Sequence, residues 1–275
     1  MSRGALLRTI LGVALCFVLA FALGACATTS ETEEEYEPGY DEGTIATEVS
    51  TLPPIKIAAL ESDDLLPLKV AQTEGLLEIR GLVVEVLIFE TVEEKHAAFS
   101  DARVDALISD MVDLALLSND DLTVYAVAVT QNLTDEQINA SSEATNTLHG
   151  TLFEIPDEFV SQRVLAFSHD FLLGNTASGE DTAPEASAEA INTLIGALAQ
   201  AVGQVNTASH AYVDLYLEQG VAAQYLYDEP TLPTYPFPEI PDREEGEALL
   251  RWLLENDKLQ RAINYDDLIF VPIAP

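Results

Sequence analysis

Short apolar segments rich in β-branched residues alternate with helical segments over residues 55–129, and this alternation constrains the fold more than any other feature. Thr91, with Glu94 three residues later, has the pattern of a helix capping box. Strands that alternate with helices form a mostly parallel sheet with helices on its faces. The sequence therefore predicts an α/β fold, with strands and helices in the chain order 55–60, 66–79, 82–89, 92–102, 104–109, 110–118 and 122–129.

The charge balance excludes several classes of partner. The chain has 12 Lys and Arg residues against 47 Asp and Glu residues, a formal net charge of −35. Nucleic-acid binding needs clustered cations on the protein, and so does a polybasic membrane patch. The sequence therefore predicts no nucleic-acid partner. Because 48% of the residues are hydrophobic, the chain has enough apolar material to fill a core.

The N-terminus has the features of an export signal. Arg3 and Arg8 precede an uninterrupted apolar run over residues 10–23, which is short for a membrane-spanning helix and typical of a signal peptide. The run ends in Leu-Gly-Ala-Cys at residues 23–26, which resembles the lipobox of bacterial lipoproteins. This resemblance implies a signal peptide over residues 1–25, a lipid on Cys26, and a protein anchored to the bacterial cell envelope that faces the periplasm or the cell exterior. The alternative is an uncleaved anchor in which Cys26 occurs by chance.

Residues 26–52 are predicted to be a flexible tether. The segment is rich in Glu and has no apolar periodicity, and like charges keep such a chain extended. A tether of this kind holds a folded domain away from the bilayer. An acidic tail that binds a partner protein is the alternative interpretation.

A set of short segments resembles one family of transport proteins. The whole set resembles the substrate-binding lipoproteins of ABC importers, in the NMT1/THI5-like branch, which binds thiamine precursors, sulfonates and similar solutes. The resemblance implies a periplasmic-binding-protein type II fold, a small-molecule solute, an ABC permease as partner, a monomer, no cofactor and no enzymatic activity. The segments that carry it occur in family order at 55–57, 67–71, 74–77, 81–86, 104–110, 190–206, 235–238, 250–253 and 263–269.

The chain departs from that family in its middle part. Binding proteins of this type have two lobes, and the solute binds between them. Residues 53–129 and 164–275 are predicted to form the main lobe, which leaves residues 130–163 for the second lobe or for an insertion. These 34 residues are fewer than the roughly 40 that an independent core needs. The sequence therefore predicts a truncated second lobe.

Polar residues that follow the predicted strands are the candidates for solute binding. In open parallel sheets, ligands bind beyond the carboxyl ends of the strands, near helix N-termini. Backbone N–H groups there favour an anion, whereas carboxylates favour a cation, and together they suit a zwitterion or a protonated heterocycle. The alternative is that these acids are ordinary helix caps on an acidic protein. The predicted ligand-binding residues are Glu61, Ser62, Asp63, Glu90, Thr91, Ser109, Asp110, Met111 and, after the return strand, Ser168.

The sequence lacks the common catalytic and metal-binding motifs, such as HExxH, CxxC and GxSxG. No catalytic residue, metal ligand or cofactor is therefore predicted. Two functions remain open. The first is solute capture for an ABC importer. The second is that of a binding-protein relative that has lost solute capture and acts as an interaction or sensing lipoprotein.

Overall fold

The structure is a computed structural model that describes residues 52–133, 146–148, 151–153, 155–156, 159, 162–217 and 232–271. The predicted signal peptide, Cys26 and residues 26–51 of the predicted tether lie outside these ranges. Leu52 is already part of the core, with 7% of its surface exposed. No helix in the described part of the chain has the length and hydropathy needed to cross a membrane.

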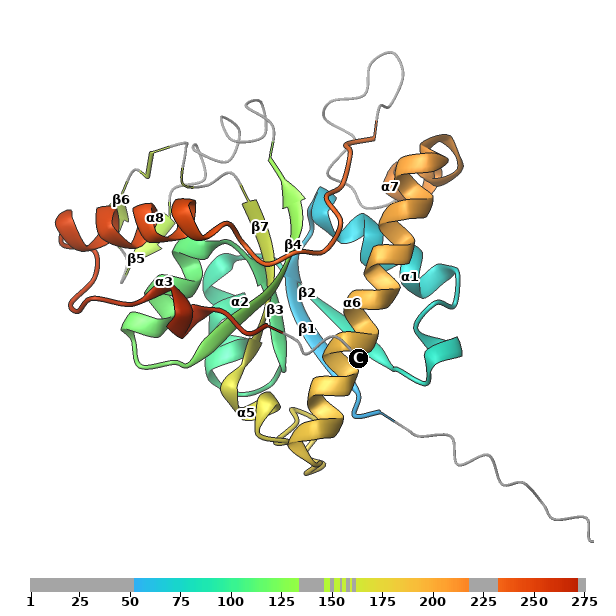
Figure 1. Ribbon diagram of the computed structural model, residues 1–275, viewed down its shortest axis with the longest axis horizontal. Coiled ribbons are helices and arrows are strands. Elements are labelled where there is room, and N and C mark those ends of the chain that lie inside the picture. The colour runs from blue at the N-terminus through green and yellow to red at the C-terminus, as the bar shows by residue number, and fades with distance from the viewer. Residues whose placement is uncertain are drawn as a thin grey trace, which may run out of the picture. The chain divides into compact units, whose positions relative to one another are not determined.

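A five-stranded sheet forms the centre of the fold (Figure 1). β1 pairs in parallel with β2 and with β3, while β7 pairs antiparallel with both β3 and β4. Four strands therefore run in one direction and β7 runs against them, which confirms the predicted mostly parallel α/β architecture. In sheet order the strands are β2 (Val84–Phe89), β1 (Ile55–Leu60), β3 (Ala106–Ser109), β7 (Gln162–Ser168) and β4 (Val124–Asn132).

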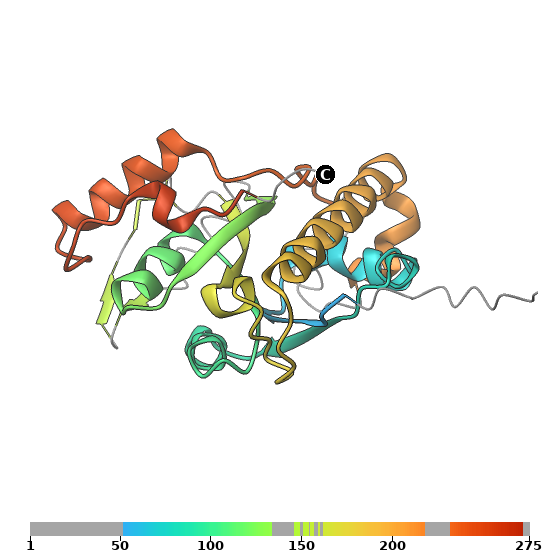
Figure 2. The ribbon, with the colours of Figure 1, turned by 60° about the horizontal axis from the view of Figure 1, so that its bottom comes forward.

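Helices cover both faces of the sheet (Figure 2). On one face, α1 (Leu66–Thr73) and the long α6 (Pro184–Thr207) share a core with Ile57 and Ile108. On the other face, a second core contains Ala58 and Leu107. Neighbouring strand residues thus point into opposite cores, which explains the almost continuous apolar runs of the central strands β1 and β3. The helices of the second face are α2 (Val92–Ser100), α3 (Met111–Asn119) and α8 (Arg243–Glu255).

Local signals in the sequence begin and end these helices. The Thr91 hydroxyl accepts a hydrogen bond from the Glu94 backbone N–H at 3.1 Å, as the capping pattern predicted. The prediction that one helix spans 66–79 was wrong, because α1 ends at Thr73. Gly75 has a φ of 66°, a left-handed conformation that glycine adopts without steric cost and that an α-helix cannot continue through. A separate 3₁₀ turn follows at Glu78–Arg80.

The middle of the chain leaves the sheet after β4 and returns in β7. β4 extends to Asn132, three residues beyond the predicted strand, and β7 begins at Gln162. Between them, β5 (Asn146–Leu148) and β6 (Thr151–Phe153) pair as an antiparallel hairpin. Most of the remaining residues of this segment lie outside the described ranges, so the truncated second lobe stays a prediction. The short helices α5 (His169–Leu172) and α7 (Val213–Leu217) precede and follow α6.

The C-terminal segments cover the outer edge of β4. The Val129 N–H donates to the Glu239 carbonyl at 2.6 Å, and the Phe270 N–H donates to the Ala126 carbonyl at 3.0 Å. Both contacts satisfy backbone groups that an edge strand otherwise leaves exposed. Residues after 232 therefore complete the same folded unit as the first strands.

Candidate functional site

The carboxyl ends of β1, β2, β3 and β4 share one edge of the sheet with the start of β7, and this is called the carboxyl edge below. Most of the predicted solute-binding residues follow these strands directly. Ser62 and Asp63 are partly buried after β1, and Ser109, Asp110 and Met111 are buried at the junction of β3 and α3. By contrast, the residues with exposed side chains are Glu61, Glu90 and Thr91.

Ser168 does not belong to this group. Because β7 is antiparallel, its last residue lies opposite Val124, the first residue of β4, at the other edge of the sheet. The Ser168 hydroxyl accepts a hydrogen bond from the Phe171 N–H at 3.2 Å and so caps α5. The direction of β7 instead brings Arg163, near its start, to the carboxyl edge.

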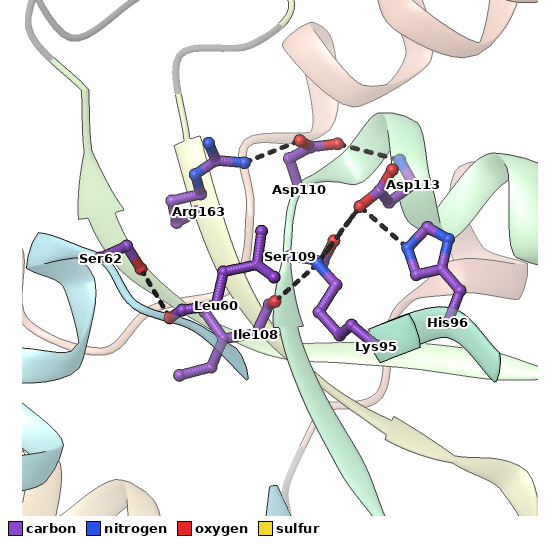
Figure 3. A network of polar contacts seen from close by, with 9 residues as sticks. All are labelled: Leu60, Ser62, Lys95, His96, Ile108, Ser109, Asp110, Asp113 and Arg163. Carbon is purple, nitrogen blue, oxygen red and sulfur yellow. Dashed lines mark hydrogen bonds and ion pairs between the residues drawn. The ribbon is translucent and has the colours of Figure 1, made fainter. Parts of the chain in front are cut away.

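Arg163 forms an ion pair with Asp110, at 2.9 Å between Nη1 and Oδ2 (Figure 3). The other oxygen of Asp110 accepts a hydrogen bond from the Asp113 N–H at 2.9 Å and caps α3. Burial and the Asp113 charge raise the pKa of Asp110, and the Arg163 guanidinium opposes this rise. Asp110 is thus engaged in two internal contacts rather than presented freely to a solute.

A buried polar network lies next to this pair (Figure 3). Lys95, which is 3% exposed, donates to the Ser109 hydroxyl at 2.8 Å and to the Ile108 carbonyl at 3.1 Å. Its ammonium lies 3.5 Å from Asp113, which also contacts the Ser109 hydroxyl and, at 3.1 Å, the His96 ring. Burial opposes ionisation of Asp113, but Lys95, His96 and Ser109 together lower the pKa of this carboxyl below its ordinary value.

The sequence analysis missed Lys95 and Asp113, although the position of Lys95 carried a signal. Lys95, Ala98 and Phe99 are spaced as neighbours on one helix face, and all three are buried. A lysine on the apolar stripe of a helix requires a buried partner, because an unpaired buried charge is costly. Nothing in the local sequence shows that this partner is Asp113.

A recess opens on the α1–α6 side of the carboxyl edge. Its cavity volume is about 20 Å³, which is enough for about one water molecule. Two of its lining residues are polar, Asp64 and Thr130. The apolar lining residues are Ile57, Pro67, Leu68, Ile108, Val129, Leu165, Leu198, Val202, Pro236 and Pro238.

Asp64 and two residues at the end of β4 supply the polar groups of this region. Asp64 is 3% exposed and accepts a hydrogen bond from Ser62, and burial raises the pKa of its carboxyl. The Thr130 hydroxyl and the Gln131 amide nitrogen are buried without a hydrogen-bond partner in the described structure. Gln131 is 2% exposed and lies opposite Arg163 in the β4–β7 register. Buried polar atoms are normally satisfied, so these two are candidates to bind a ligand or a water molecule.

The recess is covered by residues 235–239, which we call the strap. The side-chain amide of Asn206 in α6 makes two hydrogen bonds to the Tyr235 backbone. It donates to the carbonyl at 2.8 Å and accepts from the N–H at 3.0 Å. The Tyr235 hydroxyl donates to the Asp63 carbonyl at 2.7 Å. These contacts, together with the Val129–Glu239 hydrogen bond, hold the two prolines of the strap over the recess.

Replacing Asn206 by Ala is expected to destabilise the protein by about 1–3 kcal/mol, because both backbone groups of Tyr235 lose their partner. Urea unfolding measures the change. The matched control is Glu189→Ala, an exposed position on the same helix, where an effect below about 0.5 kcal/mol is expected. Equal stability of the two variants would contradict the role assigned to Asn206.

The buried carboxyls predict that the protein becomes more stable as the pH falls from about 7 to about 5. Burial raises the pKa of Asp64, Asp105 and Asp110 in the folded protein. The folded state therefore holds these protons more tightly than the unfolded state, and stability is lost as the pH rises from their ordinary pKa through their pKa in the folded protein. Asp113 acts oppositely, but its pKa is lowered and it stays ionised across this range. Urea unfolding at several pH values measures the slope, and Asp64→Asn is expected to reduce it. A stability that increases steadily from pH 5 to pH 7 would contradict this assignment.

No arrangement of three or more His, Cys, Asp or Glu side chains suited to a metal ion is present among the described residues. The Ser109 hydroxyl has the lysine and carboxylate neighbours of an activated nucleophile, but Ser109 is only 1% exposed. Both neighbours already bind the Ser109 hydroxyl, so no catalytic role is assigned to it.

No family model and no curated protein matches the sequence. Solved structures of ABC-import binding proteins do match the fold. The ligand-binding component of an ABC-type import system from Staphylococcus aureus, with zinc bound, aligns with a TM-score of 0.55 at 10% identity, over 79% of this chain and 96% of that one. The aliphatic sulphonate binding protein SsuA from Escherichia coli gives a TM-score of 0.53 at 10% identity, over 81% and 93%.

A third similar structure is the alkanesulfonate-binding protein SsuA from Xanthomonas axonopodis pv. citri bound to MOPS. It has a TM-score of 0.52 and 10% identity, over 79% of this chain and 98% of that one. Likeness at this identity shows the fold, and function has to be argued from the site. The described part of the chain has the fold of the periplasmic substrate-binding proteins, as the sequence resemblance predicted.

Proposed function

We propose that this chain is the lipid-anchored, extracytoplasmic solute-binding component of an ABC importer, and that it binds a small organic solute at the carboxyl edge. The observation that carries the proposal is a pair of buried polar atoms at the end of β4, Thr130 Oγ1 and Gln131 Nε2, which have no hydrogen-bond partner among the described residues. The fold shared with import binding proteins supports the same role. The proposal also includes a lipid on Cys26 and an ABC permease as the partner.

The polar groups of the edge indicate which solutes suit it. The Gln131 amide is a donor, and the Arg163 guanidinium has N–H groups beyond the one bound to Asp110. Thr130 can donate or accept. Sulfonates, thiamine precursors and similar nitrogenous solutes carry the acceptor atoms that these donors need. Because Asp110 offsets the charge of Arg163, a solute with a modest or delocalised negative charge fits better than a strong anion.

A thermal-shift screen tests the proposal. The panel contains thiamine-precursor pyrimidines, taurine, polyamines and amino-acid derivatives. A solute at a concentration of about 100 times its dissociation constant stabilises the folded state by about 2.7 kcal/mol, so a true ligand raises the melting temperature measurably. At least one member of the panel is expected to do so, and no shift with any member would contradict solute capture.

One observation favours the second candidate function, that of an interaction or sensing lipoprotein without solute capture. Ser109 and Asp110, which the sequence analysis placed in the solute site, are both engaged inside the protein. Genes for a permease and an ATPase next to the coding sequence would favour the importer. Their absence, combined with a negative screen, would favour the interaction role.

A further inference from the structure

We propose that the groove between α8 and residues 262–267 is a second binding site, which takes a short zwitterionic peptide of about three residues with an aliphatic side chain. Figure 1 shows the chain after α8 turning back and running along this helix. The groove shares no lining residue with the recess, and none of the polar groups of the carboxyl edge lines it. The inference therefore does not depend on the proposed solute capture.

The groove has room for a ligand of this size. Its volume is about 500 Å³, which lies within the usual range of about 300–1,000 Å³ for small-molecule sites. Residues 262–267 form one wall, and one face of α8 forms the other. The groove-lining residues of α8 are spaced as neighbours on this face, and they are Arg243, Glu247, Leu250, Arg251 and Leu254.

Contacts within the protein hold the first turns of α8 against the returning chain. A Cβ atom at position 246 would lie 2.6 Å from the Tyr265 ring, so Gly246 is what allows this ring to pack against the helix. The Arg243 guanidinium lies 4.7 Å from the centre of the same ring and pairs with Asp266 and, at 3.3 Å, with Glu247. A ligand therefore meets a preformed wall and loses little free energy in ordering it.

The two ends of the groove carry opposite charges. At the end where α8 begins, Arg243 is shared by Glu247 and Asp266, and Asp267 adds a third carboxylate, so one cation faces three anions. At the other end, the Arg251 side chain has neither an ion-pair nor a hydrogen-bond partner among the described residues. Arg251 lies four residues after Glu247 and eight after Arg243, about 6–12 Å along the helix axis.

This charge separation matches the two termini of a short peptide. Three extended residues span about 10 Å. The peptide carboxylate can then bind Arg251, which presents several N–H donors, while the ammonium group lies beside the carboxylates at the other end. A ligand with a single charge matches only one end of the groove.

The floor of the groove favours an aliphatic side chain in the peptide. Leu250 belongs to the second core, and Leu254 and Ile263 extend this apolar surface outwards. Leu254 is 38% exposed, which is unusual for a leucine beside a buried cluster. An aliphatic side chain placed here removes apolar surface of both partners from water.

Methyl NMR on the intact protein tests the site with the tripeptide Ala-Leu-Ala, whose two termini are free. The peptide is expected to shift the methyl signals of Leu250, Leu254 and Ile263 in a saturable way. Its C-terminal amide lacks the carboxylate, its N-acetyl form lacks the ammonium group, and Ala-Ser-Ala lacks the aliphatic side chain. Each of these three is expected to bind about threefold or more weakly, as the loss of an exposed ion pair or of an apolar contact predicts. Equal binding of all four peptides, no saturable shift, or shifts confined to other methyl groups would overturn the proposal.

The variant Arg251→Gln identifies the group that binds the carboxylate. It removes the charge at an exposed position, so the protein is expected to fold as wild type does, with an unchanged urea midpoint. Wild type is expected to prefer Ala-Leu-Ala to its amide, and Arg251→Gln is expected to bind the two equally. The matched control is Arg103→Gln, an exposed arginine outside the groove that pairs with Asp101, and it should keep the wild-type preference. A preference for the free carboxylate that survives in Arg251→Gln would contradict the site as described.

Discussion

Replacing Lys95 by Met is expected to destabilise the protein by about 3–5 kcal/mol, because it leaves the Asp113 carboxylate buried without its cation. The methionine fills most of the lysine volume, so the loss reports the charge pair rather than a cavity. The Ser109 hydroxyl and the Ile108 carbonyl lose the same donor. Urea unfolding measures the change as a lower midpoint.

A double variant separates the charge from the packing at this position. Lys95→Met combined with Asp113→Leu removes both charges and is expected to recover much of the lost stability, since a buried ion pair contributes little beyond an apolar pair of similar size. Lys69→Met, on the partly exposed side of α1, is the matched control and should change little. If Lys95→Met alone costs less than about 1 kcal/mol, the network does not stabilise this edge as described.

Replacing Leu165 by Ala is expected to cost about 2–5 kcal/mol, the range for deleting a fully buried leucine side chain. Leu165 is 1% exposed and lies in β7 between β3 and β4, where it faces the α1–α6 core. The same experiment tests whether the chain after the excursion returns into the central sheet. The control is Leu173→Ala, at an exposed position directly after α5, and its free energy of unfolding is expected to stay within about 0.5 kcal/mol of that of wild type. Similar losses at both positions would contradict the central placement of β7.

Local patterns predicted the elements of this fold well because each depends on neighbouring residues. The alternation of apolar strands and helices predicted β1, β2, β3 and β4, and the capping box at Thr91 and Glu94 predicted the start of α2. The direction of β7 was not predictable in the same way. Strand direction depends on which strands pair across the sheet, so Ser168 was placed at the wrong edge and Arg163 was overlooked.

The candidate site shows the same division between local and long-range information. Ser109 and Asp110 lie at the carboxyl edge as predicted, yet their side chains are bound by Lys95, Asp113 and Arg163, which come from other elements. The sequence predicted that the main lobe leaves the sheet after residue 129. β4 extends three residues further. Those residues include Thr130 and Gln131, whose Oγ1 and Nε2 atoms have no hydrogen-bond partner in the part of the chain that the structure describes.

The central claim is solute capture at the carboxyl edge. Its most direct test is isothermal titration of the Gln131→Leu variant with the solute that gives the largest thermal shift. Gln162→Leu, on the neighbouring strand, is the matched control, because its amide is partly exposed and bonded to Asn132 at 3.3 Å. The account predicts that Gln131→Leu weakens binding by about tenfold or more while Gln162→Leu leaves it nearly unchanged. Equal affinity of wild type and both variants would contradict it.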